Sequence, residues 1–69
     1  MEEIKLRDEY IKLGQALKAV NLVDSGMMAK LVIQDGLVTV NGKVETQRGK
    51  KLKDGDVVSF DGETIMIKK

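Results

Sequence analysis

The fold is decided by residues 12–56, KLGQALKAVNLVDSGMMAKLVIQDGLVTVNGKVETQRGKKLKDGD. Two helix patterns, a hairpin turn and a basic segment, residues 48–56, follow one another in this stretch. The first helix pattern places apolar residues at i, i+3, i+4 and i+7, namely Leu13, Ala16, Leu17 and Val20. This spacing lines one face of a helix. The outward positions are then Lys12, Gln15 and Lys18, and residues 21–23 break the pattern.

A second helix is predicted to begin at Asp24 or Ser25, because either residue is a good N-cap. Its inner face is predicted to hold Met28, Ala29, Val32 and Ile33, and its outer face Met27, Lys30 and Gln34. Gly36 stands where helices commonly end in a left-handed residue, so the helix is expected to stop there.

Two β-hairpins are predicted from Asn41-Gly42 and Asp61-Gly62, because both dipeptides favour the positive φ angles of a type I′ turn. Strands over 37–40 and 43–46 flank the first turn, and strands over 57–60 and 63–67 flank the second. Near the N-terminus apolar and charged residues alternate, so residues 3–7 are predicted to form a short edge strand.

The register of the second hairpin follows from its two-residue loop, which pairs Val58 with Ile65. One face of this hairpin therefore collects apolar side chains that can pack beneath the helices: Val58, Phe60, Ile65 and Ile67. In the first hairpin Val38 and Val40 are on one face and Val44 is on the other. The sequence pattern leaves open which of the two faces is buried.

Together these elements predict one α+β domain over residues 1–69, in which two short helices pack on a small, mainly antiparallel sheet built from hairpins. A chain of 69 residues buries only roughly 60% of its unfolded surface, so its stability margin is thin. No cysteine is present, so no disulfide adds to that margin.

The composition also narrows the function. Without cysteine and histidine the chain lacks thiolate nucleophiles, imidazole bases and the usual zinc ligands. We therefore expect that the protein is not an enzyme and binds no metal ion, cofactor or small-molecule substrate. Asp54-Gly55-Asp56 is expected to be a turn entering a strand, because Val58 stands where a calcium loop would place a further carboxylate. No apolar run reaches the roughly 18 residues of a membrane span, and the acidic start lacks the features of a signal peptide, so a cytoplasmic location is expected.

The net charge of +1 conceals an uneven distribution. Residues 10–53 hold eight basic and three acidic residues, a net charge of +5, whereas the two ends together hold four basic and eight acidic residues, a net charge of −4. Five basic residues and one acid fall between Lys43 and Lys53, within a Debye length of roughly 8 Å, so these like charges repel one another. A polyanion would relieve this repulsion, and a plain solvated loop is the alternative interpretation.

Five short motifs follow one another along the chain in an order that is typical of a known family: Leu22-Val23-Asp24-Ser25-Gly26, Ala29-Lys30, Val40-Asn41-Gly42, Gly49-Lys50-Lys51-Leu52 and Gly55-Asp56-Val57-Val58. Together they resemble the S-four RNA-binding domain, the alpha-L module of two helices and a sheet. Residues 45–52 and 10–15 are most similar to the small stand-alone bacterial members of the YaaA and YbcJ kind. The resemblance implies binding of structured RNA, either ribosomal RNA, its precursor or transfer RNA, through the helix pair and the loop after the first hairpin.

By position, the resemblance nominates a set of RNA-contacting residues: Lys12, Gln15, Ser25, Lys30, Asn41, Lys43, Arg48, Lys50 and Lys51. Lys18 and Lys53 join them as cations of the outer helix face and of the basic segment. The family often has an acidic residue at the position of Gly14 and an arginine at that of Gly26, so one phosphate contact is expected to be missing.

Aromatic residues bear on the kind of RNA that could be bound. Tyr10 and Phe60 are the only two, and Phe60 is expected in the core, so a stacking platform for splayed bases is predicted to be lacking. Recognition is then expected to depend on shape and phosphates. Ser25 and the following amides could bind one phosphate at a helix N-terminus, or Ser25 could be a plain N-cap.

The sequence therefore predicts a non-enzymatic, monomeric bacterial protein that binds structured RNA. The alternative is a small protein-interaction adaptor without nucleic-acid binding. A carboxylate-based hydrolase using Asp54 and Asp56 is disfavoured, because no histidine is available as a partner.

Overall fold

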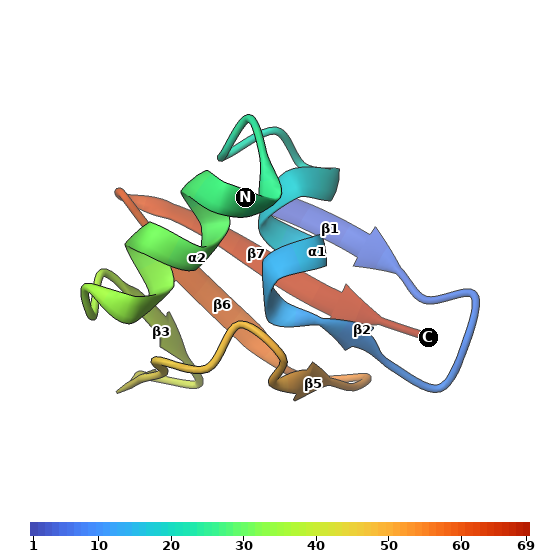
Figure 1. The fold of residues 1–69 in the computed structure, drawn as a ribbon. Helices are drawn as coiled ribbons and strands as arrows, with labels where there is room; N and C mark the ends of the chain where they lie inside the picture. Colours follow the sequence, from blue (N-terminus) through green and yellow to red (C-terminus); the bar gives the residue numbers. More distant parts are fainter.

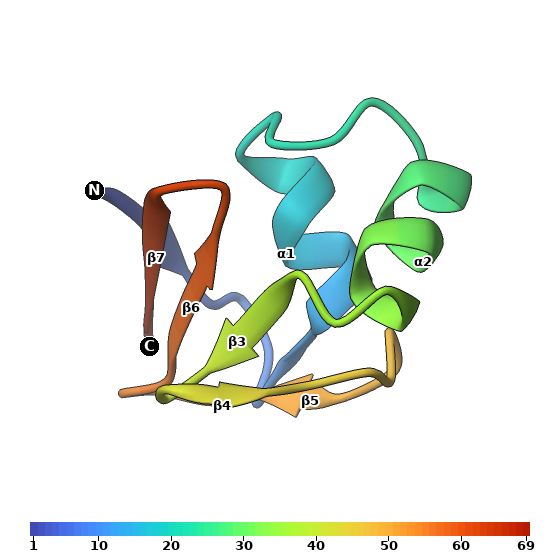
Figure 2. The same cartoon turned by 90° about the vertical axis from the view of Figure 1, so that its left-hand side faces the viewer.

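The computed structural model describes residues 1–69 and places two helices on one face of a five-stranded sheet, beside a separate two-stranded ribbon (Figures 1 and 2). The elements in chain order are β1 (Glu2–Lys5), β2 (Ile11–Lys12), α1 (Leu13–Ala19), α2 (Gly26–Gln34), β3 (Val38–Val40), β4 (Lys43–Val44), β5 (Lys51–Leu52), β6 (Val57–Phe60) and β7 (Glu63–Lys68). The sheet order is β1-β7-β6-β3-β4, with β1 parallel to β7 and the other pairs antiparallel. The predicted α+β class is confirmed.

The first helix has the predicted face. Leu13, Ala16 and Leu17 are fully buried, and Val20 is half-buried at the C-terminal end of α1. The second helix begins after Ser25, whose Oγ accepts a hydrogen bond from the Met28 amide at 3.1 Å. Ser25 is therefore the N-cap, rather than Asp24.

The predicted inner face of α2 is wrong at one position. Ala29 and Ile33 are buried and Val32 is half-buried, but the side chain of Met28 is 43% exposed. Since successive residues turn about 100° round a helix, a face centred on Ala29 and Ile33 leaves Met28 at its margin, in the first turn. The helix ends as predicted, because Gly36 has φ +77°.

Both predicted turns are present, with positive φ angles at Asn41, Gly42, Asp61 and Gly62. The predicted pairing of Val58 with Ile65 is confirmed. Val58, Ile65 and Ile67 are fully buried, whereas Phe60, expected in the core, is half-buried against its edge.

The structure also answers which face of the first hairpin is buried. Val38 and Val40 lie in the core, and Val44 is 60% exposed. The second strand of this hairpin is shorter than predicted and ends at Val44, because the chain then leaves the sheet edge and crosses toward α1. At the other edge, β1 ends at Lys5, two residues before the predicted limit, although Leu6 is still buried.

The ribbon formed by β2 and β5 was not predicted. Ile11 pairs with Leu52 and Lys12 pairs with Lys51, so the middle of the basic segment is tied to the residues that precede α1. Leu52 is fully buried in the core between exposed lysines. A single apolar side chain thus anchors the basic segment to the domain.

A side-chain clamp joins the first hairpin turn to the start of β6. The Asn41 Nδ2 group donates to Asp56 Oδ1 at 3.0 Å, and Asn41 Oδ1 accepts from the Val57 amide at 2.9 Å. Asp56 Oδ2 accepts from the Lys53 amide at 2.8 Å. Burial acts to raise the pKa of Asp56, but these hydrogen bonds from Lys53 and Asn41, with the charges of Lys50 and Lys53, outweigh it and hold the pKa below the ordinary 3.8.

Truncation of Leu52 should test the anchor. We expect Leu52→Ala to lower the free energy of unfolding by about 2–5 kcal/mol, because it removes a fully buried side chain and leaves a cavity. Leu37→Ala is the matched control, since Leu37 is 56% exposed, and it should change the value by no more than about 0.5 kcal/mol. Urea denaturation measures both, and equal losses would contradict the assignment.

The Asp56 clamp should make stability depend on pH. A carboxyl whose pKa is lowered by folding contributes stability that is complete above its ordinary value, here 3.8, and is lost as the pH falls through the lower folded-state pKa. Asp56→Asn should therefore be less stable than the wild type at pH 6, and the gap should narrow as the pH approaches 2.

Urea denaturation across this pH range measures the gap. Asp24→Asn is the control, because the Asp24 carboxylate takes part in none of the side-chain hydrogen bonds of the structure. A gap between wild type and Asp56→Asn that stays constant from pH 6 to 2 would show that the carboxylate charge contributes nothing.

Candidate nucleic-acid interface

The basic segment is docked on the N-terminal end of α1 by backbone hydrogen bonds. The Leu13 amide donates to the carbonyl oxygen of Lys50 at 2.9 Å, and the Gly14 amide donates to that of Arg48 at 3.0 Å. Amides in the first turn of a helix have no partner within the helix, so these carbonyls satisfy two of them. This docking brings Arg48 of the basic segment beside Lys12 and Lys18 at α1.

One result of this docking is a hollow between the helices, here called the interhelix groove. Its lining consists of Lys12, Gly14, Gln15, Lys18, Gly26, Ala29, Arg48 and Gly49. Four of these residues are glycine or alanine, and three are cations from α1's start, α1 itself and the basic segment. The floor is therefore low and the rim positive, which suits the approach of a phosphate backbone.

The glycines of the groove differ in what surrounds them. A Cβ at Gly14 would lie 3.6 Å from the Cβ and carbonyl oxygen of Arg48, whereas a Cβ at Gly26 or Gly49 would meet nothing within 4 Å. Neither Gly26 nor Gly49 has a positive φ angle. Glycine at these two positions is thus required by neither packing nor backbone, and it keeps the groove open.

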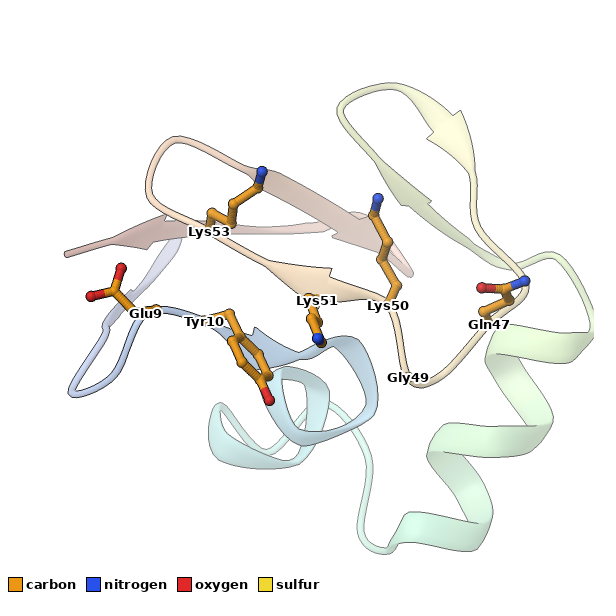
Figure 3. Close-up of a pocket in the computed structure, with 7 residues that line it drawn as sticks. All are labelled: Glu9, Tyr10, Gln47, Gly49, Lys50, Lys51 and Lys53. Carbon is orange, nitrogen blue, oxygen red and sulfur yellow. The ribbon is translucent and has the colours of Figure 1, made fainter.

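A second hollow, here called the tyrosine hollow, adjoins the groove at Gly49, which lines both. It is lined by Glu9, Tyr10, Gln47, Gly49, Lys50, Lys51 and Lys53 (Figure 3). Lys50 and Lys53 extend to one side of the β5 segment, and Lys51 extends to the other, toward Tyr10. The Lys51 Nζ atom lies 4.9 Å from the centre of the Tyr10 ring, within the range of a cation–π contact.

A third hollow lies on the other side of the same lysines. It is lined by Val40, Asn41, Lys43, Val44, Glu45, Lys50, Lys51, Lys53 and Asp56. Lys43 from the first hairpin therefore lines the same hollow as Lys50 and Lys53. A site that includes all three residues requires this proximity.

None of these cations forms a salt bridge within the chain, although Glu9, Glu45 and Asp56 line the same hollows and the charges of Lys50 and Lys53 act on Asp56. The one salt bridge in the structure joins Lys69 Nζ to Glu9 Oε1 at 3.0 Å, and neither residue belongs to the predicted site. Cations thus outnumber carboxylates in the lining of the three adjoining hollows.

The predicted site residues divide into two groups. The hollows contain Lys12, Gln15, Lys18, Asn41, Lys43, Arg48, Lys50, Lys51 and Lys53. Ser25 and Lys30 line none of them: Ser25 uses its hydroxyl to cap α2, and Lys30 is exposed on the same helix. The structure thus brings together nine of the eleven residues.

Two of these nine residues also hold the fold. Gln15 Oε1 accepts from the Lys12 amide at 3.2 Å. Asn41 uses both ends of its side-chain amide in the clamp with Asp56 and Val57. Their place in the motif therefore has a structural reason besides any contact with a ligand.

Tyr10 lines the tyrosine hollow, although the sequence did not place it in the site. Its side chain is 41% exposed and lies among lysines, although it stands next to Ile11 at the start of the ribbon. The signal in the sequence was a lone aromatic residue between Glu9 and Ile11, which by itself does not tell an exposed ring from a buried one.

The two aspartates once considered for metal or hydrolytic chemistry belong to a turn. Asp54 Oδ1 accepts from the Lys69 amide at 2.9 Å, and Asp56 forms the clamp described above. No group of three or more His, Cys, Asp or Glu side chains is arranged to hold a metal ion. Neither helix has the length and apolar character needed to cross a membrane.

Comparison with known proteins agrees with this architecture. A protein of Bacillus subtilis (strain 168) named "Probable ribosome maturation protein RlbA" is 42% identical over 59 residues, covering 86% of this chain and 83% of the relative. The "Putative RNA-binding protein YbcJ" of Escherichia coli (strain K12) is 36% identical over 58 residues, covering 84% and 83%.

Solved structures give the same result. The solution structure of YbcJ from E. coli, described as revealing an alfaL motif involved in RNA-binding, has a TM-score of 0.76 at 33% identity and covers 100% of this chain and 89% of that chain. The 30S ribosomal protein S4e of Thermoplasma acidophilum shares the fold, with a TM-score of 0.63 at 24% identity, covering 84% of this chain and 31% of that chain. The S4 domain family matches residues 4–68, and the chain therefore belongs to the S4 domain family.

Proposed function

We propose that this protein binds structured RNA, with ribosomal RNA or its precursor as the first candidate and transfer RNA as the second. The observation that carries the proposal is the set of unpaired cations that line adjoining hollows around Gly49. The name of RlbA refers to ribosome maturation and that of YbcJ to RNA binding, so both names support the same function and the first favours a ribosomal target.

Binding would rest on charge and shape. Lys12, Lys18 and Arg48 would contact phosphates along the interhelix groove, where the glycine floor lets a backbone come close. Lys50, Lys51 and Lys53 would contact the next phosphates beyond Gly49. Such contacts orient a nucleic acid without reading its sequence, so selectivity would come from the shape of a folded RNA.

The protein would act without catalysis, as a monomer in the cytoplasm. It has neither histidine nor cysteine, and the carboxylates of Asp54 and Asp56 are held by backbone amides. A ribosome maturation role, as named for RlbA, would place it where ribosomes assemble. The adaptor alternative has no comparable support.

The salt dependence of binding tests the proposal. If about four cations neutralise phosphates, the logarithm of affinity for a folded ribosomal RNA fragment should fall with the logarithm of salt at a slope near −3.6, or roughly a hundredfold between 50 and 200 mM. Lys50→Gln combined with Lys51→Gln should reduce the slope to about −1.8, because two contacts are lost. Gel-shift titration at several salt concentrations measures both slopes.

A matched control separates local contacts from net charge. Lys68→Glu also changes the net charge by two units, but Lys68 is exposed on β7 and lines none of the hollows. Its slope should equal that of the wild type. A wild-type slope near zero would count for an adaptor, whereas equal effects of both variants would count against the proposed interface.

A further inference from the structure

We infer that the ring of Tyr10 is a stacking site for one unpaired base of the RNA, so that the preferred ligand is a helix with an adjoining single-stranded nucleotide. This inference rests on the proposed function and adds the class of RNA to it. It revises the sequence-based expectation that no stacking platform is present. A platform of several rings is indeed absent, but one base needs only one ring.

The first observation is the exposure of the ring. Tyr10 is 41% exposed and lines the tyrosine hollow on the side where Lys51 extends (Figure 3). It also lines a further hollow, which includes Arg7, Ile11 and Gln15. The side chain is therefore open to solvent from more than one direction, and none of the side-chain hydrogen bonds of the structure uses its hydroxyl.

The second observation is the firm backbone beneath the ring. Ile11, the next residue, pairs with the buried Leu52, and Lys12 pairs with Lys51. Tyr10 therefore projects from the end of a paired ribbon and not from a long loop. A tyrosine side chain has two main rotatable bonds, so an aromatic ring held this way offers contact area at a low entropic cost.

The third observation is the continuity of the surface. Gly49 lines both the interhelix groove and the tyrosine hollow, and a Cβ at this position would meet nothing within 4 Å. Gly49 therefore places no side chain of its own between the interhelix groove and the tyrosine hollow, and the side chains nearest to the path are the flexible cations Lys50 and Lys51. A strand whose phosphates lie along Lys12 and Arg48 can continue over Gly49 and reach Tyr10.

The chemistry then selects the ligand. Bases inside an RNA duplex are stacked on one another and cannot stack on a side chain, whereas an unpaired base presents a free face. Any of the four bases can stack on a tyrosine, so the site would favour a structure and not a sequence. Lys51, which lies over the ring in the free protein, would move to the phosphate of the stacked nucleotide.

The experiment compares three RNA probes: a blunt hairpin, the same hairpin with a two-nucleotide overhang, and the overhang strand alone. Fluorescence anisotropy at 100 mM salt gives the affinity of each probe for the wild type, Tyr10→Leu and Tyr10→Phe. Leu37→Ala is the control, because it truncates an exposed apolar side chain outside the hollows. Thermal unfolding by circular dichroism shows whether each variant is folded.

We expect the wild type to prefer the overhang hairpin to the blunt one by about 5- to 150-fold, the range of one base–aromatic stack. Tyr10→Leu should lose that preference and keep the affinity for the blunt hairpin within about twofold, whereas Tyr10→Phe and Leu37→Ala should keep both. A 2-aminopurine in the overhang should be quenched on binding to the wild type and not to Tyr10→Leu.

Four results would overturn the inference, the last of them together with the proposed function. The wild type could bind blunt and overhang hairpins equally, or Tyr10→Leu could weaken both to the same extent, and in either case RNA binding itself would stand. If Tyr10→Leu is unfolded, the wild type alone decides the question. A wild type that shows neither a preference for the overhang hairpin nor quenching of 2-aminopurine would overturn the inference. Failure of the wild type to bind any probe would instead overturn the proposed function, and the inference with it.

Discussion

The structure depends on the contact between the basic segment and the start of α1. The amides of Leu13 and Gly14 need acceptors, because the first turn of a helix provides none, and the carbonyls of Lys50 and Arg48 supply them. Burial of Leu52 fastens the same segment from below. Like charges are thus held together by backbone hydrogen bonds and one apolar side chain.

Within the basic segment, backbone atoms hold the fold while side chains of the same residues remain exposed. Lys50 satisfies α1 through its carbonyl oxygen while its side chain extends into solvent at the hollows. Asn41 shows the opposite arrangement, because its side-chain amide is used inside the molecule. The motif residues of this chain therefore include some whose side chains hold the fold and others whose side chains are free for a ligand, and the hydrogen bonds distinguish them.

Features governed by neighbouring residues were predictable. The buried face of α1, an N-cap at Asp24 or Ser25 and the two type I′ turns follow from local spacing and turn chemistry. The structure contains the face and the turns, and it selects Ser25 as the cap. Met28 was misplaced, because the width of a helix's buried face depends on the neighbour that covers it. The ribbon of β2 and β5 was missed, because two-residue strands leave no periodic pattern.

The sequence alone determined which elements form and which residue types are available: two short helices, tight hairpins, many cations and no histidine or cysteine. Periodicity, capping and turn preferences act over a few residues, so they can be read directly along the chain. Tertiary structure decided that Arg48 lies beside Lys12 and Lys18, that Gly49 joins two hollows, and that Tyr10 is exposed. These facts depend on contacts between distant segments, and no local pattern encodes them.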